Sequence, residues 1–293
     1  MKNKRIIRRI IVILIALIVI LVVLKKCTNV LEIESIRDGE YSVENEYPYQ
    51  VAIVPKKKKK FANCGGVIIN SEWVLTAAHC FDDVRNSDFL IYLGNGELNG
   101  DGTYHEILQT YPFDFLNHEN GKLEKYDSSS YRHDILLIQL KQPLEPDFDV
   151  ELLEPISESQ LNQLIERKDS ITMVGWGKAG NFFKPQRLVK KRLPIISFDN
   201  CKKGKNIKKI LYHGMTCIGE KNIISACHGD SGGGIFYESS SDIKLIGVIA
   251  IGSDHCSNNP KHLEYDVLMN IIFYKDWIDS IIETYSLQDN INV

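Results

Sequence analysis

The feature that most constrains the fold is a long series of short apolar runs separated by turn residues. These runs begin near residue 47 and are rich in Val, Ile, Leu and Tyr. They are residues 49–54, 66–69, 73–75, 89–93, 135–138, 171–174 and 245–249. Such spacing is typical of the short strands of a β-barrel or β-sandwich. The sequence therefore predicts an all-β core.

Two segments depart from this pattern and predict helices. Apolar residues recur with helical periodicity over residues 271–286, which predicts an amphipathic terminal helix. Residues 157–168 are rich in Glu, Gln and Leu and predict a shorter helix. The 293 residues suffice for one large domain or two small ones. The net charge of −3 does not favour nucleic-acid binding.

The first 26 residues predict a targeting segment that precedes the fold. Basic residues come before an uninterrupted apolar run over residues 10–24, and Lys25 and Lys26 follow it. This charge asymmetry places the N-terminus in the cytoplasm and the remaining chain outside it. A helix over residues 10–24 would be about 22 Å long, which is shorter than the hydrocarbon core of a bilayer at about 30 Å. Spanning the membrane would therefore need the longer segment of residues 6–24. We favour an uncleaved single-pass anchor over a cleaved signal peptide and secretion, because no small residues form a cleavage site.

The cysteines indicate an oxidising compartment. The seven are Cys27, Cys64, Cys80, Cys201, Cys217, Cys227 and Cys256. Six of them follow residue 60, which suggests three disulfides, although six cysteines allow 15 pairings. Cys27 is the odd one and is expected to be a free thiol, with acylation or an intermolecular disulfide as alternatives. No zinc-site spacing is present, so no metal or cofactor is predicted.

Residues 227–234, Cys-His-Gly-Asp-Ser-Gly-Gly-Gly, predict a turn that presents a nucleophilic serine. Ser231 would need a base to take its proton and donors to bind the oxyanion that forms on the substrate. The N–H groups of Gly229 and Ser231 are candidate donors, because glycine allows the tight backbone turn. The alternative is a glycine-rich surface turn.

Two further stretches supply the missing partners. His79 stands in Leu-Thr-Ala-Ala-His-Cys and Asp134 in Arg-His-Asp-Ile-Leu-Leu-Ile. With Ser231, they follow the chain order of the trypsin/chymotrypsin family of serine peptidases, which the chain resembles over about residues 36–286. Cys-Gly-Gly at 64–66 and Gly-Trp-Gly at 175–177 also resemble that family's motifs.

The resemblance implies an all-β fold of two antiparallel six-stranded β-barrels, about residues 36–155 and 156–270. The N-terminal hydrophobic helix and a linker or propeptide at residues 27–35 would precede the barrels. A terminal helix at about residues 271–286 would follow them, and residues 287–293 would form a tail. The implied disulfides are Cys64–Cys80, Cys201–Cys217 and Cys227–Cys256.

The resemblance also implies peptide-bond hydrolysis through an acyl-enzyme intermediate. His79 would take the proton of Ser231, and Asp134 would orient His79. A new amino terminus at Ile36, freed by an activating protease, would pair with Asp230. Glu-Ser precedes Ile36, where many activating proteases prefer a basic residue.

The specificity pocket implied by the resemblance comprises Ser225, Asp266, Gly252 and His228. Trypsin has an aspartate at the position of Ser225, so basic selectivity would have to come from Asp266. If Tyr265 takes the place of Asp266, a chymotrypsin-like pocket is the alternative.

Five consecutive lysines, residues 56–60, predict a solvated loop or a site for an anionic partner. The alternative to a peptidase is a non-catalytic binding module that uses these lysines, and a membrane-bound adhesin has little support.

Overall fold

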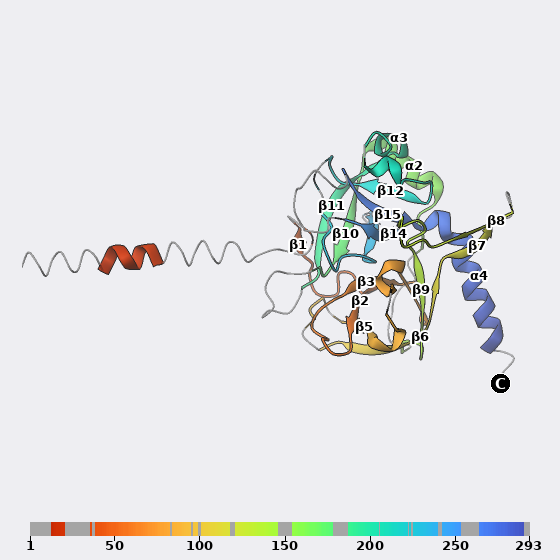
Figure 1. The fold of residues 1–293 in the computed structure, drawn as a ribbon, viewed down its shortest axis with the longest axis horizontal. Helices are drawn as coiled ribbons and strands as arrows, with labels where there is room; N and C mark the ends of the chain where they lie inside the picture. The colour runs from red at the N-terminus through yellow and green to blue at the C-terminus, as the bar shows by residue number, and fades with distance from the viewer. Residues whose placement is uncertain are drawn as a thin grey trace, which may run out of the picture.

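Two β-barrels packed against each other form the body of the protein in this computed structural model (Figure 1). The structure describes residues 13–20, 36, 39–82, 84–94, 96–98, 101–117, 121–145, 154–177, 187–204, 206–221, 223, 225–239, 242–252 and 264–289. Every strand pairing within the two barrels is antiparallel. The predicted fold of two six-stranded barrels is confirmed.

The first barrel closes in the order β2-β3-β4-β9-β6-β5. Its strands are β2 (Gln50–Pro55), β3 (Cys64–Ile68), β4 (Trp73–Thr76), β5 (Phe89–Leu93), β6 (Thr103–Pro112) and β9 (Leu136–Leu140). All of them except β6 are almost entirely buried, which matches their continuous apolar sequence. Around them lie the 3₁₀-helices η1 (Ala78–Phe81) and η2 (Asn86–Asp88) and a hairpin of β7 (Asp114–Asn117) and β8 (Lys122–Lys125).

The second barrel has the order β11-β10-β13-β14-β15-β12, and pairing of β11 with β12 closes it. Its strands are β10 (Ser170–Gly175), β11 (Val189–Ile196), β12 (Met215–Ile218), β13 (Gly234–Glu238), β14 (Ile243–Ile251) and β15 (Asp266–Asn270). A short strand, β1 (Glu40–Tyr41), also pairs with β11. Residues 40–41, which the sequence placed with the first barrel, therefore join the second.

Besides η1 and η2, the described helical segments of the body are α2 (Glu158–Arg167), α3 (Phe198–Cys201), η3 (Ile207–Lys209) and α4 (Ile271–Asp289). The predicted helix near residues 157–168 is confirmed as α2. It begins at a capping box, in which Ser157 Oγ accepts the N–H of Gln160 and the Gln160 side chain accepts the N–H of Ser157.

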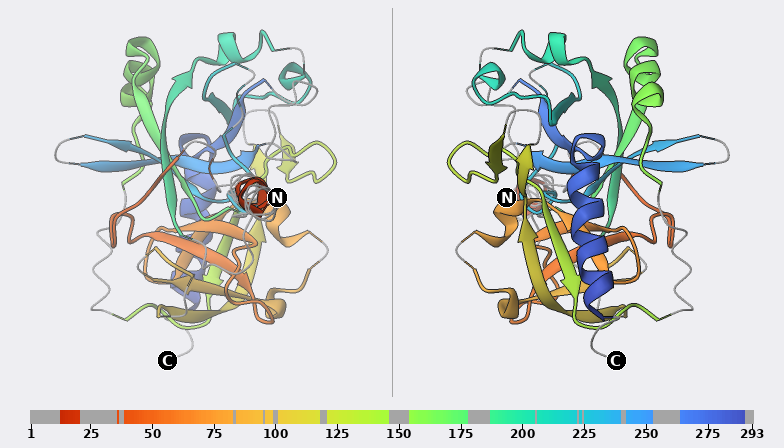
Figure 2. Two further views of the ribbon diagram at one scale, coloured as in Figure 1. Left: turned by 90° about the vertical axis from the view of Figure 1, so that its left-hand side faces the viewer. Right: turned by 90° about the vertical axis from the view of Figure 1, so that its right-hand side faces the viewer.

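The terminal helix α4 lies across both barrels (Figure 2). It follows β15 of the second barrel directly, and its Tyr274 and Trp277 rings pack edge-on against Phe113 of the first. Further along, Tyr285 contacts Trp73, again in the first barrel. The helix therefore fixes the two barrels relative to each other.

Two of the three predicted disulfides are confirmed, Cys64–Cys80 and Cys201–Cys217. Cys227 is disulfide-bonded as well, but its predicted partner Cys256 lies outside the described residues, as does Cys27. Each confirmed bridge joins residues 16 apart. Cys64–Cys80 ties β3 to η1.

The predicted anchor segment lies mostly outside the described residues. Residues 13–20 are helical and exposed. Of the helices that the structure describes, none combines the length and the apolar character needed to cross a membrane.

Candidate active site

His79 and Asp134 are brought together by two neighbouring strands of the first barrel. Thr76, the last residue of β4, pairs with Leu136, the first residue of β9, so residues just after β4 meet residues just before β9. Asp134 Oδ2 lies 2.7 Å from His79 Nδ1, and Asp134 Oδ1 accepts a 2.8 Å hydrogen bond from the backbone N–H of His79. The carboxylate therefore holds both the backbone and the ring of the histidine.

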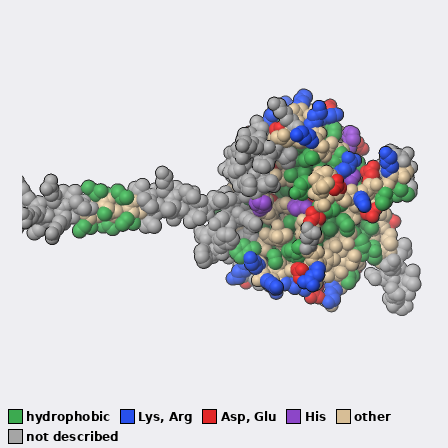
Figure 3. Space-filling model, viewed as in Figure 1, with side chains coloured by type: hydrophobic (Ala, Val, Ile, Leu, Met, Phe, Trp, Pro, Cys, Tyr) green, Lys and Arg blue, Asp and Glu red, His purple; other side chains and the backbone are tan. Residues whose placement is uncertain are grey.

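This contact sets the tautomer and the pKa of His79. Because a carboxylate only accepts hydrogen bonds, Nδ1 carries the hydrogen and Nε2 is left as the basic nitrogen. Burial by itself would lower the pKa of His79, but the hydrogen bond and charge of Asp134, helped by Asp82, raise it above 6.5. The His79 side chain is 23% exposed, whereas Asp134 is fully buried. Figure 3 shows histidine side chains at the surface close to where the two barrels meet.

Ser231 stands in a tight turn that is held against the first barrel. Its carbonyl oxygen accepts a 2.7 Å hydrogen bond from the N–H of Gly65. Gly232 has a φ of +78°, and a Cβ there would lie 2.1 Å from Thr76 Oγ1. Only glycine permits this approach, which seats the turn against the strand that leads to His79. Among the described contacts, no hydrogen bond joins the side chains of Ser231 and His79.

The backbone around Ser231 leaves two N–H groups available for an oxyanion. Gly229 has a φ of +90°, a conformation that favours glycine. Within the part of the chain that the structure describes, the N–H groups of Gly229 and Ser231 make no backbone hydrogen bond. Such groups are suitable donors for a developing negative charge.

Ile36 and Asp230, the predicted activation pair, are both fully buried. Asp230 Oδ2 accepts a 2.9 Å hydrogen bond from the N–H of Cys227. Its Oδ1 has no hydrogen bond of ordinary geometry among the described residues, although the N–H of Gly177 still favours the charged form. Burial raises the pKa of Asp230 well above its usual range. A Cβ at Gly175 would lie 2.4 Å from Oδ1, so this carboxylate needs glycine beside it.

The predicted specificity residues lie around one segment, residues 225–227. Asp266 Oδ2 accepts the N–H of Ser225 at 2.8 Å, and Oδ1 accepts the N–H of Ala226 at 3.1 Å. A Cβ at Gly252 would lie 2.7 Å from the Cβ of Ala226, so Gly252 faces the same segment. His228 follows it and is exposed. Asp266 therefore does border Ser225, with both of its oxygens turned to the backbone.

A family model described as Trypsin matches residues 36–278. The chain belongs to the trypsin family. A solved structure of the secreted serine protease VesC from Vibrio cholerae is also similar, with 25% sequence identity and a TM-score of 0.63. The match covers 82% of this chain and 47% of the VesC chain, so the present chain spans about half the length of that relative.

Three residues close to the candidate site were not singled out from the sequence. The Tyr131 ring lies edge-on to His79 with 5.9 Å between centroids and is 41% exposed, so it forms a wall beside the histidine. Lys191 Nζ donates a 3.0 Å hydrogen bond to Ser225 Oγ. His133 is buried directly before Asp134. No local motif marks Tyr131 or Lys191, because each contacts a distant part of the chain.

The described residues of this trypsin-family domain do not indicate a metal site. Among the described residues, only Cys64, His79 and Cys80 place three potential ligand atoms within 4.8 Å of one another. The two cysteines are joined in a disulfide and offer no thiolate, which is the form that binds metal. The cluster instead shows how closely the Cys64–Cys80 bridge supports His79.

Proposed function

We propose that this chain is a serine endopeptidase that cleaves peptide bonds through an acyl-enzyme intermediate. The observation that carries the proposal is the 2.7 Å contact between His79 Nδ1 and Asp134 Oδ2, beside the strand end on which the Ser231 turn is seated. An oriented imidazole with a raised pKa is the base that a serine hydroxyl requires. Membership of the trypsin family supports the same assignment.

The proposed reaction uses the three side chains in sequence. Ser231 Oγ attacks the substrate carbonyl carbon while His79 Nε2 takes its proton, and the N–H groups of Gly229 and Ser231 bind the oxyanion. His79 then gives this proton to the leaving amine, and the acyl group stays on Ser231. Water, deprotonated by His79, releases the acyl group and restores the serine. Asp134 stabilises the positively charged His79 at each step.

Activation is proposed to depend on a new amine at Ile36. Asp230 is a buried carboxylate whose Oδ1 lacks a good hydrogen bond, and burying such a group is costly unless a positive charge compensates. An activating protease that cuts before Ile36 would supply this charge as an α-ammonium. Since the N–H of Cys227 also binds Asp230, the new ion pair would set the backbone next to Gly229.

Substrate recognition is proposed to involve Ser225, Asp266, Gly252 and His228. Ser225 belongs to the segment 225–227, Asp266 and Gly252 contact this segment, and the exposed His228 follows it. These residues would contact the substrate side chain that precedes the cleaved bond.

The location is proposed to be outside the cytoplasm, either on a membrane anchor at residues 6–24 or as a secreted protein. Disulfides form and persist in oxidising compartments, and Cys64–Cys80 and Cys201–Cys217 are such bonds. The exposed lysines at residues 56–60 would attract an anionic partner. Lys56 is already paired with Glu106 at 3.4 Å, so the other lysines would supply most of the attraction.

A fluorophosphonate probe, which reacts only with an activated serine, tests the proposal. We expect it to label the protein at Ser231 once the chain is cut before Ile36, and Ser231→Ala to abolish labelling. Ser239→Ala, which changes an exposed serine that has no role in the proposed reaction, is the matched control. Absence of labelling in the cut wild-type protein would favour the non-catalytic binding module instead.

A further inference from the structure

Lys191 and Asp266 meet at Ser225 from two different strands of the second barrel. Asp266 is the first residue of β15, and Lys191 lies within β11. The backbone N–H of Ser225 donates to Asp266 Oδ2, and the hydroxyl of Ser225 accepts from Lys191 Nζ. A cation, a hydroxyl and a carboxylate thus form one polar unit at the wall of the proposed specificity site.

The carboxylate of Asp266 is not free to bind a basic substrate side chain directly. Asp266 is fully buried, and its oxygens already accept the N–H groups of Ser225 and Ala226 at 2.8 and 3.1 Å. Burial raises the pKa of Asp266 to about 7, and the two N–H groups and the charge of Lys191 each oppose this rise. Lys191 therefore stabilises the ionised form of a carboxylate whose burial would otherwise be strongly unfavourable.

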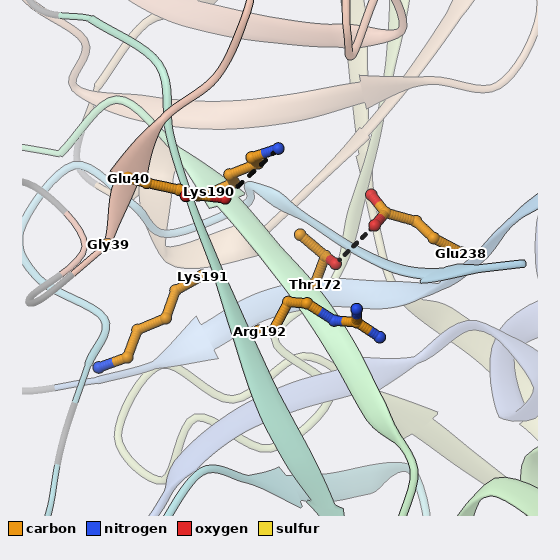
Figure 4. Close-up of a pocket in the computed structure, with 7 residues that line it drawn as sticks. All are labelled: Gly39, Glu40, Thr172, Lys190, Lys191, Arg192 and Glu238. Atoms are coloured by element: carbon orange, nitrogen blue, oxygen red, sulfur yellow. Dashed lines mark hydrogen bonds and ion pairs between the residues drawn. The ribbon is translucent and has the colours of Figure 1, made fainter.

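The direction of the Lys191 side chain supports a specific role. Side chains alternate between the two faces of a strand, and Figure 4 shows Lys191 leaving β11 away from its neighbours Lys190 and Arg192. Lys190 pairs with Glu40 at 3.5 Å and with Glu46, on the other side of the strand. Lys191 is thus directed to Ser225, whereas the adjacent lysine is not.

We propose that Lys191 determines substrate specificity by neutralising Asp266 at the base of the specificity site, which makes this peptidase prefer uncharged over basic side chains before the cleaved bond. The inference rests on the proposed peptidase function. Bridged by Ser225, the positive charge of Lys191 and the negative charge of Asp266 would offset each other. An incoming arginine or lysine side chain would lose its hydration shell there without gaining a counter-charge.

The test measures kcat/KM for matched peptides that differ only in having Arg, Lys, Leu or Phe before the cleaved bond. We expect the wild-type protein to favour Leu or Phe. In Lys191→Met, a basic substrate side chain would take the place of Lys191 as the counter-charge that keeps Asp266 ionised, and we expect the ratio of basic to uncharged cleavage to rise by roughly 10- to 100-fold. Lys191→Arg keeps the charge and should keep the wild-type ratio. Lys190→Met, the neighbour on the opposite face, is the matched control and should not change it.

Labelling of Ser231 by the fluorophosphonate probe is measured on every variant, since it does not depend on the substrate side chain. No labelling in the wild-type protein after it has been cut before Ile36 would refute the peptidase function itself. Labelling combined with a wild-type preference for Arg or Lys would overturn the role of Lys191, even if Lys191→Met does not fold. An unchanged ratio in a labelled Lys191→Met protein would overturn it as well.

Discussion

His133 should make the stability of the protein depend on pH. Its side chain is 1% exposed and stacks on Phe113 with 4.5 Å between ring centroids. Its Nδ1 lies 3.3 Å from the hydroxyl of Tyr274, and its Nε2 lies 3.5 Å from a carboxylate oxygen of Glu124. Burial lowers the pKa of His133 to about 4, with the charge of Arg132 acting in the same direction and Glu124 against it.

The sign and size of the effect follow from this pKa. In the unfolded chain the pKa of His133 is near 6.5, so between pH 6.5 and pH 4 the unfolded state binds a proton at His133 that the folded state does not bind. The free energy of unfolding therefore falls as the pH falls through this window and levels off below pH 4. The full difference corresponds to about 3 kcal/mol, of which about 2 kcal/mol is lost between pH 7 and pH 4.5.

Urea unfolding at pH 7 and at pH 4.5 measures this loss. We expect His133→Gln to lose about 2 kcal/mol less than the wild-type protein over this interval, because glutamine does not titrate. Any strain from glutamine at the positive φ of this position is present at both pH values and cancels. His213→Gln, at an exposed histidine stacked on Phe198, should behave as the wild-type protein does. Equal pH dependence in His133→Gln and wild type would refute the reasoning.

Two further predictions concern the turn at Gly232 and the general base His79 of the proposed active site. Gly232→Ala should lower the free energy of unfolding by about 2–5 kcal/mol, because its Cβ meets Thr76 and its φ is positive. Gly121→Ala is the control, because Gly121 also has a positive φ but a Cβ there would have no atom within 4 Å, so the difference between the two variants measures the clash with Thr76. If both variants lose the same free energy of unfolding in urea, the close approach of the Ser231 turn to Thr76 is contradicted. The kcat/KM of peptide hydrolysis should rise with pH around a midpoint above 6.5, as His79 loses its proton. Asp134→Asn should lower this midpoint and reduce the rate on the order of 10²–10⁴-fold, and an unchanged midpoint would show that another group titrates.

The sequence predicted the strands whose side chains are buried on both faces. Phe89–Leu93 is apolar throughout and forms β5 with those bounds. By contrast, β6 is largely exposed, and β11 carries Lys190, Lys191 and Arg192 in succession. Each of these strands is held in place because its backbone pairs with neighbouring strands on both sides. Its sequence therefore needs no regular apolar period, and a strand cannot be predicted from one.

The residues of the proposed site also fall into those that the sequence predicted and those that it did not. His79, Asp134 and Ser231 stand in local motifs, so their spacing and order are enough to indicate the chemistry. Lys191 does not, because its partner Ser225 is distant in sequence and meets it only once β11 has closed the barrel. A charge in a strand ordinarily indicates a solvated face, and only the contact shows that this one is directed inward.

The position of α4 has a consequence for the timing of synthesis. Its aromatic side chains cover Phe113 and Trp73 of the first barrel, yet α4 is translated after every strand of both barrels. Domains emerge from the ribosome N-terminal end first, so the aromatic face of the first barrel stays uncovered until residues 271–285 have been synthesised. The order of translation thus postpones the covering of this aromatic face until the last helix of the fold has been made.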